Sequence, residues 1–181
     1  MRKICSLYLL FLFMSFIGFT YETILAIILK FDDLDRGFLS LPLCPIYGSG
    51  VILTYLLFDI PKNMRILKYK IKSNYKIKVY LYILFSAIIA TILELIIGTF
   101  FEQKFNIVLW AYGNDMLTFN RYCALIPSLF WGISITIFMS SFFTKIYNKI
   151  YNFKLENIYS ISITFTIFIL LDLINIIFIN V

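Results

Sequence analysis

Histidine is absent from the sequence, and only three cysteines occur among its 181 residues. Histidine is the commonest general base and the commonest transition-metal ligand, so its absence argues against most metal-dependent and acid–base enzymes. The cysteines, Cys5, Cys44 and Cys123, show no Cys-x-x-Cys spacing, which argues against a structural zinc site, while a disulfide between Cys44 and Cys123 is left open. We therefore expect no metal, no cofactor and no enzymatic activity.

Charged residues are also scarce. They make up 14% of the chain, whereas hydrophobic residues make up 61%. This composition is typical of integral membrane proteins. A chain of this length accommodates one helical bundle, so we expect an all-α, polytopic membrane fold with residues 1–181 in a single domain.

Five apolar segments approach or exceed the ~20 residues that a helix needs to cross a bilayer. The first follows Met-Arg-Lys, as in a signal peptide, but its apolar run continues to Leu29, so we expect an uncleaved span. Residues 105–112 are too short to cross, and we expect an interfacial or re-entrant piece there. The predicted transmembrane helices are residues 4–29, 40–60, 79–101, 122–143 and 157–180.

The start of the second predicted span has an irregular composition. Residues 36–50 contain Pro42 and Pro45 together with three glycines and an arginine. Irregular backbone at membrane depth is tolerated only where protein or a water-filled cavity satisfies it. We therefore expect a broken or re-entrant segment near residues 37–50.

Basic residues predict the orientation of the chain. Most of the 16 lysines and arginines lie before the first span, in the second connection and in the fourth. Cytoplasmic connections carry such an excess, so we expect the N-terminus inside and the C-terminus outside, in the cytoplasmic membrane. The same distribution explains the net charge of +6, and we expect no binding to nucleic acid.

The second connection, residues 61–78, carries seven cations and no acid. Topology alone accounts for this charge. The alternative is a docking surface for anionic lipid or for an acidic partner protein. The candidate docking residues are Lys62, Arg65, Lys68, Lys70 and Lys72.

Three acids, Glu22, Glu94 and Asp172, lie within predicted spans. An ionisable group inside a span is costly and usually faces the bundle interior or a cavity. The natural partners of these acids are Arg36 and Arg121, and we expect two acid–arginine pairs, because such pairs would offset the cost of burial. Asp172 is left as a third acid, partnered by an asparagine or lying near water.

These charges define a candidate site with two interpretations. The functional interpretation is a polar site, open to the outside, that binds a ligand or relays protons and cations. The structural alternative is a set of ion pairs that only hold helices together. Aromatic residues that could line such a site include Tyr47, Trp110 and Tyr112.

Residues 4–60 and 79–143 follow one pattern. Each part has a glutamate within its first span, a Lys-Phe pair after that span, an arginine followed by proline six residues on, and an aromatic residue followed by glycine. We expect a parallel repeat of two helices, with residues 157–180 as an extra span.

Several of these motifs match a known family. The first group is Tyr21-Glu22, Arg36-Gly37-Phe38-Leu39 and Pro45-Ile46-Tyr47-Gly48-Ser49-Gly50, and the second is Glu94, Glu102, Lys104-Phe105, Trp110, Tyr112 and Asn120-Arg121 with Cys123. Together they resemble the bacterial membrane family described as putative ABC-transporter type IV, over about residues 15–135. The resemblance implies a permease-like membrane protein.

The chain also departs from that family at three positions. Leu41 replaces a glycine before the first proline, Ala111 replaces an aspartate in Trp-Asp-Tyr, and Asn120 replaces a glycine before the arginine. The missing aspartate weakens any ion-binding or catalytic role that would have used it.

The leading hypothesis is a permease-like subunit that acts with a separate ATPase, because the sequence shows no Gly-x-x-x-x-Gly-Lys-Ser/Thr nucleotide loop. The alternative is a non-transporting sensor, scaffold or accessory subunit that binds a small ligand or a membrane partner. An enzyme that uses Glu22 or Glu94 as acid or base is the least favoured reading. A homo-oligomer is compatible with each of them.

Overall fold

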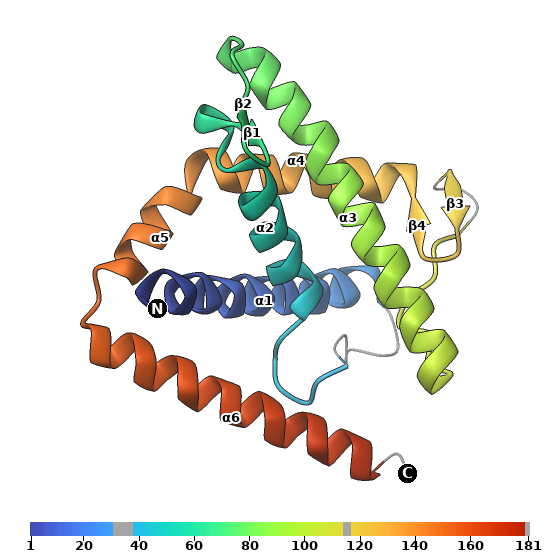
Figure 1. Ribbon diagram of the computed structural model, residues 1–181. Helices are drawn as coiled ribbons and strands as arrows, with labels where there is room; N and C mark the ends of the chain where they lie inside the picture. Colours follow the sequence, from blue (N-terminus) through green and yellow to red (C-terminus); the bar gives the residue numbers. More distant parts are fainter. Residues whose placement is uncertain (31–37, 114–116, 180–181) are drawn as a thin grey trace. The chain divides into compact units, whose positions relative to one another are not determined.

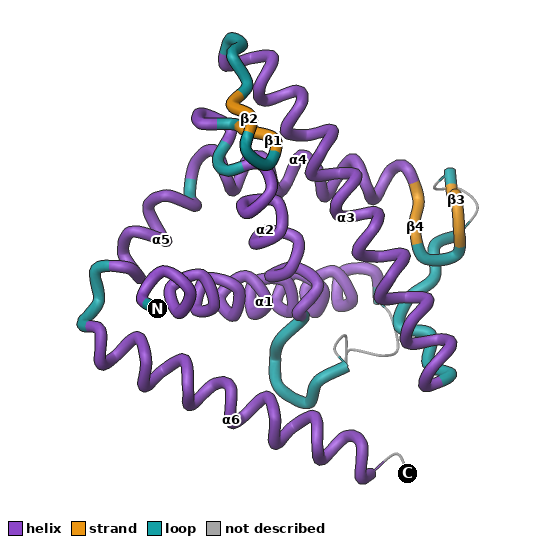
Figure 2. Tube along the Cα trace, viewed as in Figure 1, coloured by secondary structure: helices purple, strands orange, loops and turns teal. Residues whose placement is uncertain are grey.

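The computed structural model describes residues 1–30, 38–113 and 117–179. These residues form helices and two small antiparallel hairpins (Figures 1 and 2). The helices are α1 (Arg2–Leu29), α2 (Pro45–Phe58), the 3-10 helix η1 (Pro61–Asn63), α3 (Tyr75–Phe105), α4 (Leu125–Ser141), α5 (Phe143–Tyr151) and α6 (Leu155–Ile179). The strands are β1 (Arg65–Ile66) paired with β2 (Tyr69–Lys70), and β3 (Thr118–Asn120) paired with β4 (Cys123–Ala124).

The predicted helical membrane class is confirmed, and three or four candidate spans are found among the described residues. Among the described residues, α1, α3 and α6 are long and apolar enough to cross a membrane, and α4 with α5 makes a fourth candidate if that bent pair is one span. Helix α2 has 14 residues. It therefore rises about 21 Å, which is less than the ~30 Å hydrocarbon layer. The prediction of five spans stays a prediction.

Contacts divide the chain into two compact units. Unit 1 comprises residues 1–49 and 144–181, and unit 2 comprises residues 50–143. Each unit carries part of the candidate site, and each is described by itself.

Unit 1 is built on the contact between α1 and α6. Residues 38–44, which we call the approach segment, form no helix and precede α2. Leu39 and Leu43 of this segment are buried in a cluster with Leu12 of α1. The approach segment is therefore part of the packed interior of unit 1.

The backbone N–H groups of the approach segment find protein acceptors. The N–H of Leu41 donates to a carboxylate oxygen of Asp172 at 3.1 Å, and the N–H of Leu43 donates to the carbonyl of Leu41 at 2.6 Å. The N–H of Cys44 donates to the carbonyl of Ser15 at 3.0 Å. An irregular stretch with its donors satisfied in this way is the kind that a membrane tolerates, because no water is needed to solvate it.

Unit 2 is built on α3 and α4, which pack closely along their length. Small residues make this approach possible: a Cβ on Gly132 of α4 would lie 2.6 Å from the carbonyl oxygen of Ile83 of α3. Ser86 donates to the carbonyl of Gly132 at 3.0 Å, and Thr91 donates to Ser128 at 2.7 Å. Small residues and interhelical hydroxyl bonds are the usual means by which helices associate in lipid.

The β1–β2 hairpin is fixed to the start of α3 rather than hanging free. Met64, just before β1, is fully buried. The hydroxyl of Tyr82 on α3 donates to the carbonyl of Asp59 at 2.6 Å, and Arg65 pairs with the Asp59 carboxylate at 3.5 Å. The basic connection predicted from the sequence thus has a defined structure.

Candidate functional site

Glu94 of α3 is the buried acid of unit 2. Its side chain is only 6% exposed, and the hydroxyl of Tyr112 donates to its Oε1 at 2.8 Å. The backbone N–H of Tyr112 donates to the carbonyl of Arg121 at 2.9 Å. The chain after α3 therefore returns over the helix and brings a tyrosine hydroxyl to the carboxylate.

Tyr122 holds the β3–β4 hairpin against α3. Its ring lies on Gly98, where a Cβ would overlap the ring atoms. The indole Nε1 of Trp110 donates to the carbonyl of Tyr122 at 3.0 Å, and the two rings meet edge to face. Trp110 thus serves to position the hairpin that lies beside Glu94.

Arg121 forms its ion pair with Glu102 rather than with the buried acid Glu94. Its Nη1 lies 2.8 Å from Oε1 of Glu102, two turns further along α3. Both side chains of this pair are substantially exposed. Arg121 therefore neutralises the surface acid Glu102 near the C-terminal end of α3. The buried acid Glu94 accepts a hydrogen bond from the neutral hydroxyl of Tyr112 instead.

Two ionisable groups in and beside β4 have raised pKa values. Burial raises the pKa of the Cys123 thiol, and the negative charge of Glu94 raises it further. Burial raises the pKa of the Tyr122 phenol, and the Glu102 carboxylate adds to that effect. Both side chains are thus held in their neutral forms around neutral pH.

Glu22 of α1 is the corresponding acid of unit 1. The hydroxyl of Tyr47, in the first turn of α2, donates to its Oε1. The Tyr47 ring lies on Gly18, where a Cβ would overlap it. Arg36, one of the two arginines expected to pair with the acids, lies outside the described residues.

Asp172 has a different role from the other two acids. Its carboxylate accepts the backbone N–H of Leu41, 131 residues away in the chain. This bond joins α6 to the approach segment, so Asp172 satisfies irregular backbone rather than remaining near water.

The structure brings together Glu94, Trp110, Tyr112 and Arg121 in unit 2, and it joins Glu22 with Tyr47 in unit 1. Sequence reasoning named Glu102 only as part of a family motif, and it missed Tyr122 and the glycines beneath the tyrosines. Helical spacing offered a signal for one of them, because Gly98 lies one turn after Glu94 on the same face of α3. Nothing comparable pointed to Glu102 as the partner of Arg121.

Metal binding finds no support in the described part of the chain. No group of three His, Cys, Asp or Glu side chains is close enough to hold an ion there. Cys5, Cys44 and Cys123 form no disulfide in the described part of the chain.

Apolar helices of membrane-spanning length, in which carboxylates are held by tyrosine hydroxyls, define a helical membrane protein. The model of one protein family, described as Putative ABC-transporter type IV, matches residues 9–177. The chain belongs to this family. The resemblance seen in its motifs is thereby confirmed, and it extends beyond them at both ends. Comparison with curated proteins and with solved structures found no match.

Proposed function

We propose that this protein is the membrane-embedded subunit of a transporter and works with a separate ATPase in the bacterial cytoplasmic membrane. The family match over residues 9–177 is the observation that carries this proposal. It favours a transport role over an enzymatic one, since ABC transporters hydrolyse ATP on dedicated nucleotide-binding subunits. The remaining features of the proposal concern topology, docking and the polar site.

The proposed topology has five spans, with the N-terminus inside. The short helix α2 crosses the membrane together with the approach segment. Support comes from the distribution of basic residues and from the satisfied backbone of that segment, which suits a dry environment. Cysteine accessibility in intact cells tests this arrangement: a cysteine at Lys68 should react only after permeabilisation, and one at Phe119 should react before it.

The β1–β2 hairpin is the proposed docking surface for the ATPase. Lys62, Lys68, Lys70 and Lys72 are exposed on it or beside it. Tyr69, at its tip, is 82% exposed. A fixed hairpin with an aromatic tip and a basic surround suits an acidic partner, because little conformational freedom is lost on binding. Arg65 is not included among these docking residues, because it already pairs with Asp59 and holds the hairpin in place.

Each unit is proposed to carry its own polar site, formed by Glu22 with Tyr47 in unit 1 and by Glu94 with Tyr112 in unit 2. A carboxylate within an apolar helix is costly, so its retention favours a role in recognising a cation or a polar solute. In unit 2 the exposed Glu102, which pairs with Arg121 of the β3–β4 hairpin, lies on the same helix as Glu94, towards its C-terminal end.

The internal repeat is also proposed, and matching close contacts support it. Gly48 packs on the backbone of Phe11, and Gly132 packs on the backbone of Ile83. Phe11 precedes Glu22 by eleven residues, the interval by which Ile83 precedes Glu94. Each glycine also follows a large aromatic residue. Residues 4–60 and 79–143 would therefore use the same helix–helix contact twice.

Site-specific photo-crosslinking tests the transport proposal directly. The photoreactive residue p-benzoylphenylalanine placed at Tyr69 should capture a protein that binds ATP, identified by mass spectrometry and by its nucleotide binding. The matched control is the same residue at Phe119, an exposed aromatic of the other hairpin at 69% exposure, which should not capture it. Capture of no ATP-binding protein from Tyr69 would reject the paired ATPase.

The accessory-subunit alternative is favoured by one observation. Glu22 and Glu94 are each already engaged by a tyrosine hydroxyl, as expected if these acids only fix helices and loops. The variants Glu22→Gln and Glu94→Gln separate the two functions. Under the transport proposal they accumulate normally but lower the ATPase activity of the captured complex in proteoliposomes. Unchanged activity, or failure to accumulate, would favour the structural role.

A further inference from the structure

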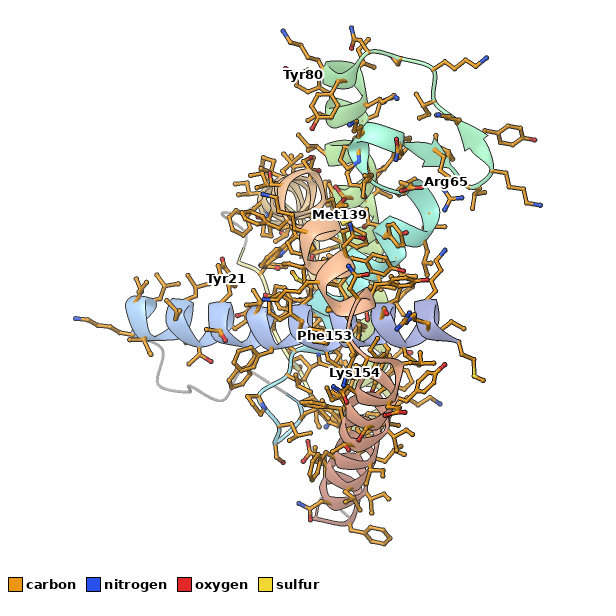
Figure 3. All side chains as sticks on the ribbon, turned by 90° about the vertical axis from the view of Figure 1, so that its left-hand side faces the viewer. Tyr21, Arg65, Tyr80, Met139, Phe153 and Lys154 are labelled. Carbon is orange, nitrogen blue, oxygen red and sulfur yellow. The ribbon has the colours of Figure 1, made fainter. Side chains whose placement is uncertain are left out.

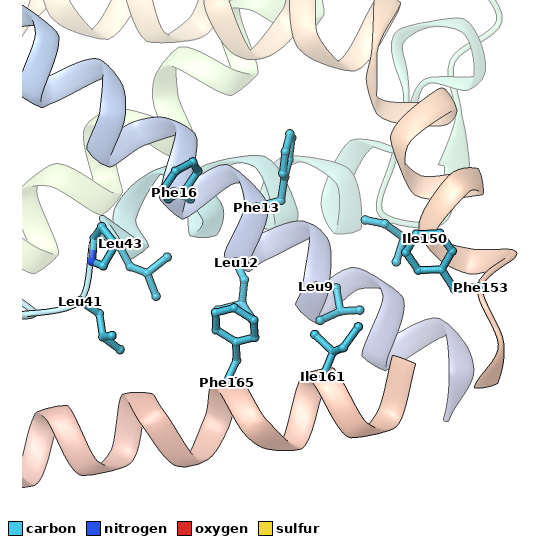
Figure 4. A pocket seen from close by; sticks show the side chains of 11 residues that line it. Leu9, Leu12, Phe13, Phe16, Leu41, Leu43, Ile150, Phe153, Ile161 and Phe165 are labelled. Carbon is cyan, nitrogen blue, oxygen red and sulfur yellow. The ribbon is translucent and has the colours of Figure 1, made fainter. Parts of the chain in front are cut away.

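An apolar groove lies between α1 and α6 of unit 1 (Figure 4). Its volume is about 480 Å³, within the ~300–1,000 Å³ typical of ligand pockets. Leu9 and Leu12 line it from α1, and Ile161 and Phe165 line it from α6. All of its lining residues are apolar, so a molecule that fills it must present an apolar part.

The groove is open to its surroundings. Phe16 and Phe165 line it, yet they remain 48% and 41% exposed. Sealed apolar cavities stay dry and can remain empty. An open apolar groove on a membrane protein, by contrast, is in direct contact with lipid, so a lipid acyl chain is the molecule available to fill it.

Positive charge gathers at one end of this groove. Phe153 lines the groove, and its carbonyl accepts a 3.0 Å hydrogen bond from Nη2 of Arg2. The Arg2 guanidinium also lies over the ring of Tyr151, 5.4 Å from its centre. Lys154, which follows Phe153 (Figure 3), and Lys3 are exposed. One acid, Glu156, follows in the first turn of α6, so the cations are in excess.

Arg2 retains hydrogen-bonding capacity for an anion. Its Nε is buried and has no partner within the described part of the chain. A guanidinium binds phosphate through two nitrogens at once, and only one of its nitrogens is used by Phe153. Seven residues separate Arg2 from Leu9, which is about 10 Å of helix, so a headgroup at Arg2 leaves its tail to reach the groove.

We propose that the groove binds an acyl chain of an anionic phospholipid, whose phosphate is held by Arg2, Lys3 and Lys154. The groove by itself would accept the tail of any phospholipid. The cations select a negatively charged headgroup, and each adjacent cation strengthens binding by about fivefold. This site is independent of the transport proposal and requires only that the chain lies in a membrane.

Native mass spectrometry of the purified full-length protein tests the site. The probes are phosphatidylglycerol and phosphatidylcholine with identical acyl chains. The wild-type protein should retain one phosphatidylglycerol under conditions that remove phosphatidylcholine. Removing two cations by Arg2→Ala with Lys154→Ala should weaken phosphatidylglycerol binding by about 25-fold. Equal retention of both lipids by the wild-type protein would overturn the proposal.

A second set of variants tests the groove separately from the charge. Ile161→Trp fills the groove from a position that is 38% exposed, so the fold should tolerate it while phosphatidylglycerol is lost. Phe165→Trp should act in the same way. Lys104→Ala removes an exposed lysine in the last turn of α3 and should bind lipid as the wild type does. Wild-type retention by both tryptophan variants would show that the groove takes no part, which contradicts the proposal.

Discussion

The backbone amide of Leu41 and the carboxylate of Asp172 form a 3.1 Å hydrogen bond across 131 residues of chain. The amide belongs to the irregular approach segment, and the carboxylate lies in a stretch of α6, from Ile167 to Ile174, that is otherwise apolar. A charged acceptor in such a helix has a structural purpose, because the amide would otherwise be left without a partner in an apolar environment.

The first prediction concerns this bond. Asp172→Leu should lower the free energy of unfolding by about 1–3 kcal/mol, since it leaves the Leu41 amide unsatisfied. Asp172→Asn keeps an acceptor oxygen and should cost much less. Thermal unfolding in detergent measures both. Equal losses in the two variants would show that the charge matters and the hydrogen bond does not.

The second prediction concerns the glycines that allow close helix contacts. Gly132→Ala places a Cβ 2.6 Å from a backbone oxygen of Ile83, and Gly48→Ala meets the backbone of Phe11. Each should lower stability by about 1–3 kcal/mol because the backbone cannot easily move aside. Gly50→Ala is the matched control: its Cβ has no atom nearer than 3.7 Å, and alanine favours the helix by about 1 kcal/mol.

Unfolding in detergent micelles distinguishes these three glycine variants. If all three variants changed the free energy of unfolding by the same amount, helix propensity rather than close packing would govern these positions.

The third prediction concerns Glu94 and Tyr112. Tyr112→Phe removes the hydroxyl that donates to the buried carboxylate and should cost about 1.5–3 kcal/mol. In the presence of Glu94→Gln the same change should cost less, because the acceptor no longer carries a charge. A double-mutant cycle on unfolding measures this coupling. A coupling energy near zero would argue that the two side chains act independently.

The fourth prediction concerns the Arg121–Glu102 ion pair. Both side chains are substantially exposed, so Arg121→Ala should cost less than about 1 kcal/mol, and high salt should remove the effect. The exchanged pair, Arg121→Glu with Glu102→Arg, should recover the wild-type stability. A loss comparable to that of Tyr112→Phe would mean that Arg121 has a further role in the fold.

The fifth prediction concerns the thiol of Cys123. It is 3% exposed, and burial together with Glu94 raises its pKa, so little thiolate exists at neutral pH. Maleimide should label Cys123 very slowly in the folded protein, faster as the pH rises, and rapidly in denaturant. A Cys5→Ser, Cys44→Ser background isolates the signal. Fast labelling of the folded protein at neutral pH would contradict the buried placement of β4.

Much of this architecture was predictable from the sequence because it follows from solvation. Long apolar segments must form helices in a bilayer, and this requirement correctly located α1, α3 and α6. The prolines before α2 correctly indicated a break, since proline cannot donate a helical hydrogen bond. The helix then begins at Pro45, five residues later than the predicted span.

The partners of the acids could not be predicted in the same way. A carboxylate accepts equally well from an arginine, a tyrosine or a backbone amide, and charge alone favoured an arginine. In the structure Glu94 instead accepts a hydrogen bond from the Tyr112 hydroxyl, because the chain after α3 returns over the helix and brings Tyr112 to the carboxylate. That path is determined by the contacts of Tyr122 on Gly98 and of Trp110 on Tyr122, which no periodicity in the sequence reveals.

The closely packed glycines also limit how this chain can change during evolution. At Gly48 and Gly132 the first obstacle to a side chain is a backbone oxygen of the neighbouring helix, so even the smallest replacement displaces a helix rather than a rotamer. Gly113 has no atom within 4 Å of its would-be Cβ, and Gly50 has ordinary room. Diverging relatives should therefore vary freely at positions 50 and 113, while both helix-contact glycines persist.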